Sequence, residues 1–258
     1  MRLNFFKKHA SKVNKSIMNK VSSRKFFRAI AFLFTTGASR HVFFLYIKDY
    51  FCRVRNSNNS QNQVKGIFST DWFSGNIPHW NLIFDKYFEK TKIINSLEIG
   101  SWEGRSSLFI LENLPMTTLT CVDTWGGADE HQDLINLSSI ENLFDSNTKA
   151  YSNRLKKFKG TSFKFFNTYS EAEKFDLIYI DGSHFVNDVL IDALKGFEHL
   201  NVGGIMIFDD YFWDYYPDPF LNPAAAINCF INLKKDYLRI ESVYAQLVIQ
   251  KIAYEIRN

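Results

Sequence analysis

The chain has 258 residues, a length that suits one good-sized domain with an extension, or two small domains. Its hydrophobic content of 46% is ordinary for a globular protein and permits a sizeable core. The three cysteines are odd in number and lack CxxC spacing. This argues against a disulfide framework and a structural zinc site, and indicates a reducing, cytoplasmic compartment.

Charge is distributed unevenly along the chain. Although the formal net charge is +4, residues 1–55 contain 13 Lys or Arg and a single acid, Asp49. This leaves 18 of the 31 bases and 26 of the 27 acids for the remainder. The sequence therefore predicts a basic arm, residues 1–55, attached to an acidic body.

The arm carries amphipathic helical patterns. Val13, Ile17 and Val21 recur every four residues, and apolar residues over 26–34 follow a second helical spacing. The most apolar run, AIAFLFTTGA, is about half the length needed to cross a bilayer. Three interpretations stay open: the helices pack on the body, they contact an anionic membrane surface, or their bases bind nucleic-acid phosphates. No specific nucleic-acid motif is present in the chain.

A polar stretch and then alternating apolar runs follow the arm. The stretch VRNSNNSQNQVKG is rich in Asn, Ser and Gln, so we predict a linker over 56–66 and one domain over 67–258. The predicted strands are 94–99, 118–123, 163–167, 175–181 and 204–209, with helices over 104–113 and 185–199 and a closing antiparallel pair in the tail. This alternation predicts an α/β fold with a parallel sheet covered by helices on both faces.

The stretch LEIGSWEGRSS, residues 97–107, lies where the first strand gives way to a helix. Gly100 permits a tight turn, and Gly104 permits close approach at the helix start. The spacing matches neither the dinucleotide fingerprint nor the P-loop. Glu98 is also a poor neighbour for a pyrophosphate, because like charges repel.

A cofactor with a cationic centre and an ammonium group suits these acids better. S-adenosylmethionine has both groups and no phosphate. Asp123 ends the next predicted strand, 19 residues after Gly104, where a carboxylate can accept hydrogen bonds from ribose hydroxyls. The alternative is a glycine-containing turn with solvated acids.

These segments resemble class I S-adenosylmethionine-dependent methyltransferases, in particular the metal-dependent O-methyltransferase branch with catechol and macrolide-sugar enzymes. The resemblance covers roughly residues 68–254 and continues through FDLIYIDGSH, LNVGGIMIFDDY and YAQLVIQK. It implies a Rossmann-like, mostly parallel seven-stranded sheet with a C-terminal antiparallel strand pair. It also implies that the cofactor is bound by Glu98, Gly100, Ser101, Gly104, Asp123, Trp125 and Asp181.

A second group of acids follows two apolar runs. Asp181 ends FDLIYID, and Asp209 with Asp210 ends GGIMIFDD. Parallel strands that end together bring these three carboxylates to one edge, where clustered acids repel unless a cation lies between them. Oxygen ligands suit a hard cation, with Mg²⁺ first. The family resemblance assigns metal binding to the same three positions.

His184 follows Asp181 by three residues and suits the role of general base, because imidazole titrates near neutral pH. A histidine here matches the sugar-modifying relatives, whereas catechol-type relatives have lysine. The alternatives are a structural histidine, a helix cap at Ser183, and a solvated face for Asp188 and Asp192.

Two aromatic loops complete the expected site. Trp125 precedes the loop 126–131 and is expected near the adenine, and the rings of 211–219 are expected to line the acceptor site.

The sequence thus predicts Mg²⁺-dependent methyl transfer from S-adenosylmethionine to a hydroxyl of a small molecule or glycan, with a sugar-type acceptor favoured. Two alternatives remain: another reaction at the same metal site, such as hydroxylation, and a non-catalytic binding protein docked on a membrane through residues 1–55.

Overall fold

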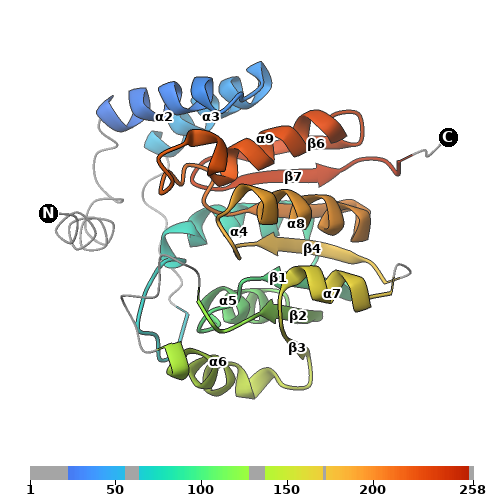
Figure 1. The fold of residues 1–258 in the computed structure, drawn as a ribbon. Helices are drawn as coiled ribbons and strands as arrows, with labels where there is room; N and C mark the ends of the chain where they lie inside the picture. Colours follow the sequence, from blue (N-terminus) through green and yellow to red (C-terminus); the bar gives the residue numbers. More distant parts are fainter. Residues whose placement is uncertain (1–22, 56–63, 128–136, 171–172, 256–258) are drawn as a thin grey trace, which may run out of the picture.

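A mixed seven-stranded sheet organises the chain in the computed structural model, which describes residues 23–55, 64–127, 137–170 and 173–255 (Figure 1). The strands are β1 (Ile94–Ile99), β2 (Thr117–Asp123), β3 (Leu155–Lys159), β4 (Phe175–Ile180), β5 (Leu200–Phe208), β6 (Leu238–Val243) and β7 (Leu247–Lys251). Their order is β3-β2-β1-β4-β5-β7-β6. The five strands β1 to β5 pair in parallel, and β7 pairs antiparallel with both β5 and β6. The predicted fold class and C-terminal antiparallel pair are confirmed.

Helices cover both faces of this sheet (Figure 1). They are α2 (Ser23–Thr35), α3 (Arg40–Arg55), α4 (Ile77–Tyr87), α5 (Arg105–Asn113), α6 (Ile140–Thr148), α7 (Ser162–Thr168), α8 (Val186–His199) and α9 (Pro223–Lys234), with short 3-10 turns at Ser74–Asn76, Leu137–Ser139, Lys149–Tyr151 and Pro219–Leu221. Alternate residues of the central strands point to opposite faces. Ile178 and Ile180 therefore join the core beneath α7, α8 and α9, whereas Leu177 and Tyr179 join the core beneath α4, α5 and α6.

One predicted strand is wrong. Residues 163–167 lie in helix α7, whose start is capped by Thr161: its side chain accepts a hydrogen bond from the Lys164 amide. The two neighbouring rings Phe165 and Phe166 are both buried, which a helix permits on one broad face and a half-buried strand does not. The remaining parallel strand is β3, which lies earlier in the chain.

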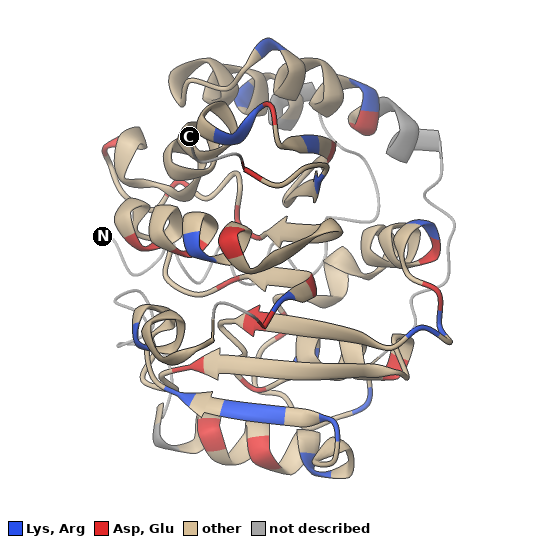
Figure 2. Ribbon diagram, turned by 90° about the vertical axis from the view of Figure 1, so that its right-hand side faces the viewer, with Lys and Arg blue, Asp and Glu red and all other residues tan. Residues whose placement is uncertain are grey.

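The lysines of β3 explain why it lacks an apolar signature. This strand is at the sheet edge, beside the acidic face of α6 (Figure 2). Lys157 Nζ lies 2.9 Å from Glu141 Oε1 and 2.6 Å from Asp145 Oδ1, and Lys159 also pairs with Glu141. Strand β3 thus contacts α6 partly through ion pairs. It buries fewer apolar side chains than the central strands do, so it has no apolar run in the sequence.

The described part of the arm packs on the body. Helix α2 confirms the helix predicted over 26–34, whereas the pattern at 13–21 and residues 56–63 of the linker lie outside the described residues. Leu33, Val42 and Tyr46 are buried in the same core as α8 and α9. No helix in the described ranges is both long and apolar enough to span a bilayer.

Two polar contacts, one buried and one partly buried, join the arm to the body. Asn228 of α9 donates a hydrogen bond to the Thr36 carbonyl at 2.9 Å, and it accepts one from the Tyr211 hydroxyl at 2.8 Å. Asp49 accepts a hydrogen bond from the Val243 amide of β6 at 2.9 Å. The only acid of the arm is therefore directed at the body.

Candidate active site

The ends of β1 and β4 meet at the point where the strand order reverses. The chain builds outward from β1 through β2 to β3 and then returns to place β4 on the other side of β1. Ligands of such sheets bind at this switch point, beyond the carboxyl ends of the strands. Sequence and topology thus bring the loop after β1 and the loop after β4 to one crevice.

Gly100 is required by the close approach of these two loops. It has φ of +86°, and a Cβ at this position would lie 1.9 Å from the Asp181 carbonyl oxygen. No side chain fits in that space. The predicted positions Gly100 and Asp181 are therefore adjacent.

Asp123 shapes the loop that follows Gly100. Its Oδ2 accepts hydrogen bonds from the Ser101 and Trp102 amides, both at 2.8 Å, and its Oδ1 accepts one from the Trp125 amide at 2.7 Å. Trp102 has φ of +48°, a conformation that these bonds help to hold. Since a carboxylate has about four acceptor positions, Asp123 retains acceptor capacity on Oδ1.

Glu98 supports the crevice from behind. Its side chain is fully buried, where it accepts a hydrogen bond from the Ser107 hydroxyl of α5 and a longer one, 3.4 Å, from the Cys121 thiol. Burial raises the pKa of this carboxyl. In this structure Glu98 joins β1, β2 and α5 and is closed off from solvent.

Trp125 also has a packing role in the structure. Its indole N–H donates to the Trp102 carbonyl at 2.9 Å, and its ring packs on Phe144 with centroids 4.9 Å apart. Phe144 in turn lies against Gly104, the start of α5, which has φ of +83°. The expected loop beyond Trp125 is described only as far as Gly127.

Potential metal ligands converge beside Gly100. Asp181 follows β4, Asp210 follows β5, and His184 lies in the turn before α8. One ligand atom from each of these three residues lies within 4.8 Å of the others. His184 Nε2 is 2.9 Å from Asp210 Oδ2. This set differs from the set predicted from the sequence, because it contains His184 in place of Asp209.

Asp209 is held by a polar network. Its Oδ2 accepts hydrogen bonds from the Tyr179 hydroxyl, from Gln246 at 3.0 Å and from Asn76 at 3.5 Å. Gln246 is itself fixed by the buried indole N–H of Trp80 at 2.8 Å. Sequence reasoning assigned no role to these four residues, although all of them lie within the range 68–254 that the family resemblance covers.

The carboxylates of the site crowd one another. Burial, with the neighbouring charges of Asp209 and Asp210, holds the pKa of the Asp181 carboxyl well above its usual range. Burial and the charge of Asp210 raise the pKa of Asp209 to about 6. Clustered acids with raised pKa values are typical of positions at which a cation compensates the negative charge.

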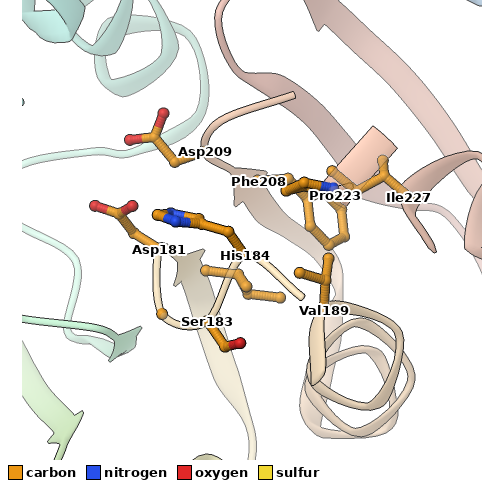
Figure 3. A pocket seen from close by; sticks show the side chains of 10 residues that line it. Asp181, Ser183, His184, Val189, Phe208, Asp209, Pro223 and Ile227 are labelled. Carbon is orange, nitrogen blue, oxygen red and sulfur yellow. The ribbon is translucent and has the colours of Figure 1, made fainter. Parts of the chain in front are cut away.

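A small pocket opens at this cluster. Figure 3 shows the His184 ring directed toward the carboxylates of Asp181 and Asp209, with an apolar wall opposite. That wall is formed by Val189, Phe208, Pro223 and Ile227. The pocket therefore combines polar groups from two strand ends with apolar groups from β5, α8 and α9.

The aromatic loop after Asp210 divides into two parts. Phe212 contacts Phe32 and Tyr46 of the arm, with centroids 5.4 and 5.2 Å apart, and so anchors the loop. Trp213 lies over His184, with ring centroids 4.8 Å apart, and Tyr215 stacks against Trp213 at 6.3 Å. These last two rings adjoin the candidate site, and their contact with an acceptor stays a prediction.

The comparisons agree with this architecture. Residues 97–211 match the family described as "Methyltransferase domain", a range that includes both the Gly100 loop and Asp210. The matched segment is thus similar to a methyltransferase domain, and the Rossmann-like fold is the one that solved methyltransferases share. At the sequence level, 140 residues are 29% identical to the uncharacterized protein R132 of Acanthamoeba polyphaga mimivirus, covering 53% of this chain and 59% of that protein.

Solved structures of O-methyltransferases share the fold. One is MycE, from the mycinamycin biosynthetic pathway, in complex with Mg, S-adenosylhomocysteine and mycinamycin VI. The match has TM-score 0.51 and 17% identity, and it covers 70% of this chain and 50% of MycE. Another is TomG of Streptomyces achromogenes, with TM-score 0.51, 13% identity and coverage of 69% and 81%. A third is a putative O-methyltransferase of Klebsiella pneumoniae, with TM-score 0.54, 15% identity and coverage of 83% and 100%. The chain thus spans about half the length of MycE.

Proposed function

We propose that this protein is an S-adenosylmethionine-dependent O-methyltransferase that uses a divalent cation, preferably Mg²⁺, to methylate a hydroxyl of a small molecule or glycan. The observation that carries the proposal is the convergence of Asp181, His184 and Asp210 beside the Gly100 crevice. Sheets with such a switch point bind ligands beyond the carboxyl ends of their strands, which supports a donor site at that crevice. The acidic cluster would then face the acceptor hydroxyl.

The crevice suits the donor. Gly100 lets the loop after β1 pack directly against the Asp181 backbone, and Asp123 keeps an acceptor position for a ribose hydroxyl. Ser101 and Gly104 belong to the same loop, so they would face the donor mainly through backbone atoms. Glu98 and Trp125 would act by holding this loop in shape.

The acidic cluster suits a hard cation. Carboxylate oxygens and one imidazole nitrogen form a donor set that Mg²⁺ or Mn²⁺ accepts. When bound, the sulfonium donor supplies an electrophilic methyl group and the cation lowers the pKa of a coordinated hydroxyl. Asp181 and Asp210 belong to both candidate ligand sets. The third ligand is Asp209 in the set predicted from the sequence and His184 in the set that the structure brings together.

His184 would accept the hydroxyl proton if the cation is held by Asp181, Asp209 and Asp210, because its imidazole is then not a metal ligand. Its ring is directed into the pocket (Figure 3), and the Asp210 carboxylate 2.9 Å from Nε2 stabilises the protonated form. Transfer then consists of forming the oxygen–carbon bond, breaking the carbon–sulfur bond and leaving the proton on the imidazole. The fixed positions of the loop and the cluster contribute mainly by orienting the reactants.

The acceptor is proposed from the shape and chemistry of the pocket. Trp213 and Tyr215 offer flat apolar faces that suit a sugar ring or a macrolide. MycE, whose fold is similar, was solved with a macrolide and Mg. A histidine at position 184 favours a sugar-type hydroxyl over a catechol.

Metal binding is the direct test of the cluster. We expect Mn²⁺, used as a paramagnetic probe, to bind the full-length protein, and Asp181→Asn or Asp210→Asn to weaken it by about tenfold or more. Asp214→Asn removes an exposed acid from the same loop and serves as the matched control. A loss in Asp209→Asn but not in His184→Asn would favour the sequence-derived set. Equal Mn²⁺ affinity in all variants would contradict the metal site.

Methyl transfer tests the role of His184. With a radiolabelled methyl donor and a panel of sugar, macrolide and catechol hydroxyl compounds, we expect transfer that EDTA abolishes. His184→Asn should lower transfer by about 100-fold while donor binding stays unchanged, because a positioned base typically contributes this much. His41→Asn, on the exposed side of α3, is the control. Full activity in His184→Asn would rule out the histidine as base.

A further inference from the structure

Helices α2 and α3 expose large aromatic rings on the side that does not pack on the body. Phe27, Phe34 and Phe44 have exposed fractions of 67%, 74% and 66%. Phe27 and Phe34 are seven residues apart and so share one face of α2. Phe43 links the two helices at this surface, since its ring contacts both Phe34 and Phe44 with centroids 5.4 and 5.9 Å apart. We call Phe27, Phe34 and Phe44 the phenylalanine face.

Basic side chains accompany the phenylalanine face. Arg40, Phe44 and Lys48 are spaced by four residues, so the two bases flank the exposed ring along α3, and both are exposed. Arg28 is next to Phe27, and its side chain is 81% exposed. The single acid of the arm, Asp49, is directed away toward the Val243 amide. Asp214 of the body lies 3.9 Å from Arg28, in an ion pair whose two side chains are both exposed. The described surface is thus apolar, and Arg40 and Lys48 give it positive charge beside Phe44.

We infer that the phenylalanine face is a docking surface for an anionic lipid bilayer. Exposed aromatic rings with Lys and Arg around them are typical of helices that lie in the interface of a membrane, where the rings enter the acyl boundary and the bases contact lipid phosphates. The positive charge of the arm favours an anionic bilayer. The body carries more acids than bases and would be repelled by such a surface, so the arm is the part of the chain that would contact it. Neither helix spans the bilayer, so the contact is peripheral.

The docking surface and the active site meet through one pair of helices. The inner side of the arm contacts Phe212, which follows the acidic cluster by two residues, through Phe32 and Tyr46. Docking would therefore hold the acceptor loop at a fixed distance from the membrane without using any residue of the cluster. This inference does not depend on the methyl-transfer proposal, because the surface and the cluster share no side chain.

Vesicle flotation of the full-length protein tests the inference. We expect flotation with vesicles of phosphatidylcholine and phosphatidylglycerol, little with phosphatidylcholine alone, and a decrease at high salt because surface charges are screened. The triple variant Phe27→Ser/Phe34→Ser/Phe44→Ser should lower the partition coefficient by about tenfold or more. Phe163→Ser/Phe220→Ser removes two rings exposed elsewhere, at 58% and 62%, and should leave flotation unchanged.

A second variant, which changes charge and keeps the exposed rings, separates a loss of membrane binding from a loss of folding. Arg40→Glu/Lys48→Glu retains the rings and should reduce flotation on anionic vesicles only. Circular dichroism melting of each variant confirms that the fold is intact. Unchanged flotation in the triple variant would assign binding to another part of the chain and overturn the inference. Absent flotation, with a dimer that the triple variant dissociates, would instead identify the face as an interface between two copies.

Discussion

At the scale of single residues, Gly100 and Asp123 shape the loop that we propose binds the cofactor. At Gly100 the loop after β1 contacts the backbone after β4. Asp123 accepts hydrogen bonds from the backbone amides of Ser101 and Trp102. Each residue has a structural reason to be present even without a ligand. The same geometry places this loop at the switch point of the sheet, where open α/β sheets bind their ligands.

Replacing Gly100 by alanine should destroy the crevice. The added Cβ would lie 1.9 Å from the Asp181 carbonyl oxygen, so the strand ends must separate, and we expect a loss of about 3 kcal/mol or more of stability together with donor binding. Gly203→Ala is the control, because Gly203 also has positive φ but no atom within 4 Å of the new Cβ. That variant should lose only about 1–2 kcal/mol. Similar melting temperatures for the two variants would contradict this account of Gly100.

Asp192 provides a pH-dependent prediction. Its side chain is 2% exposed, and burial, with a smaller contribution from Asp188, raises its pKa to about 7. The folded protein therefore binds a proton that the unfolded chain, with its ordinary pKa of 3.8, releases, and stability falls as pH rises from about 4 to 7. Asp192→Asn should stabilise the protein at pH 8 by on the order of 2–4 kcal/mol and change it little at pH 4.

Urea unfolding of both proteins across this pH range measures the effect. The exposed Asp188→Asn variant should show no comparable gain. A constant difference between Asp192→Asn and the parent protein at all pH values would show that the carboxyl titrates normally. The sequence had suggested a solvated face for Asp188 and Asp192, and this is wrong for Asp192, because residues four apart on α8 straddle the edge of its buried face.

At the scale of elements, the sequence identified the strands that end at the site. Strands β1, β2, β4 and β5 are apolar runs, and β2 ends at Asp123 while Gly100, Asp181 and Asp209 directly follow the other three. Both the strands and the residues at their ends could therefore be predicted from the sequence. The strand β3 was missed because an edge strand paired with α6 needs no apolar run. The ligand set was only partly readable, since the hydrogen bonds that occupy Asp209 come from distant segments.

Helix α2 should tolerate changes on one side only. Leu33 is 1% exposed and lies in the core with α9, whereas its neighbour Phe34 is 74% exposed. Leu33→Ala should cost about 2–4 kcal/mol through lost burial and the cavity that remains. Phe34→Ala should cost less than about 0.5 kcal/mol. Chemical unfolding of the two variants decides the matter, and equal losses would show that the arm does not pack on the body as described.

At the scale of the whole molecule, one sheet supports both the candidate active site and the arm that bears the phenylalanine face. The crevice and the acidic cluster lie at the ends of its central strands, while β6 at one edge contacts α3, which bears part of the phenylalanine face. In the sequence, the arm and the body are distinguished by their opposite net charges. The sequence could not establish how the arm docks, because the contacts of Asn228 with Thr36 and of Asp49 with Val243 join residues almost two hundred positions apart.

The measurement that tests the account most directly is isothermal titration of the folded, full-length protein with S-adenosylmethionine, with and without Mg²⁺. Because Gly100 and Asp123 form the crevice without help from the acidic cluster, we predict saturable binding at one site per chain in both conditions, and its loss in Gly100→Ala but not in Gly203→Ala. Absence of binding in both conditions, for protein whose circular dichroism spectrum shows that it is folded, would contradict the account.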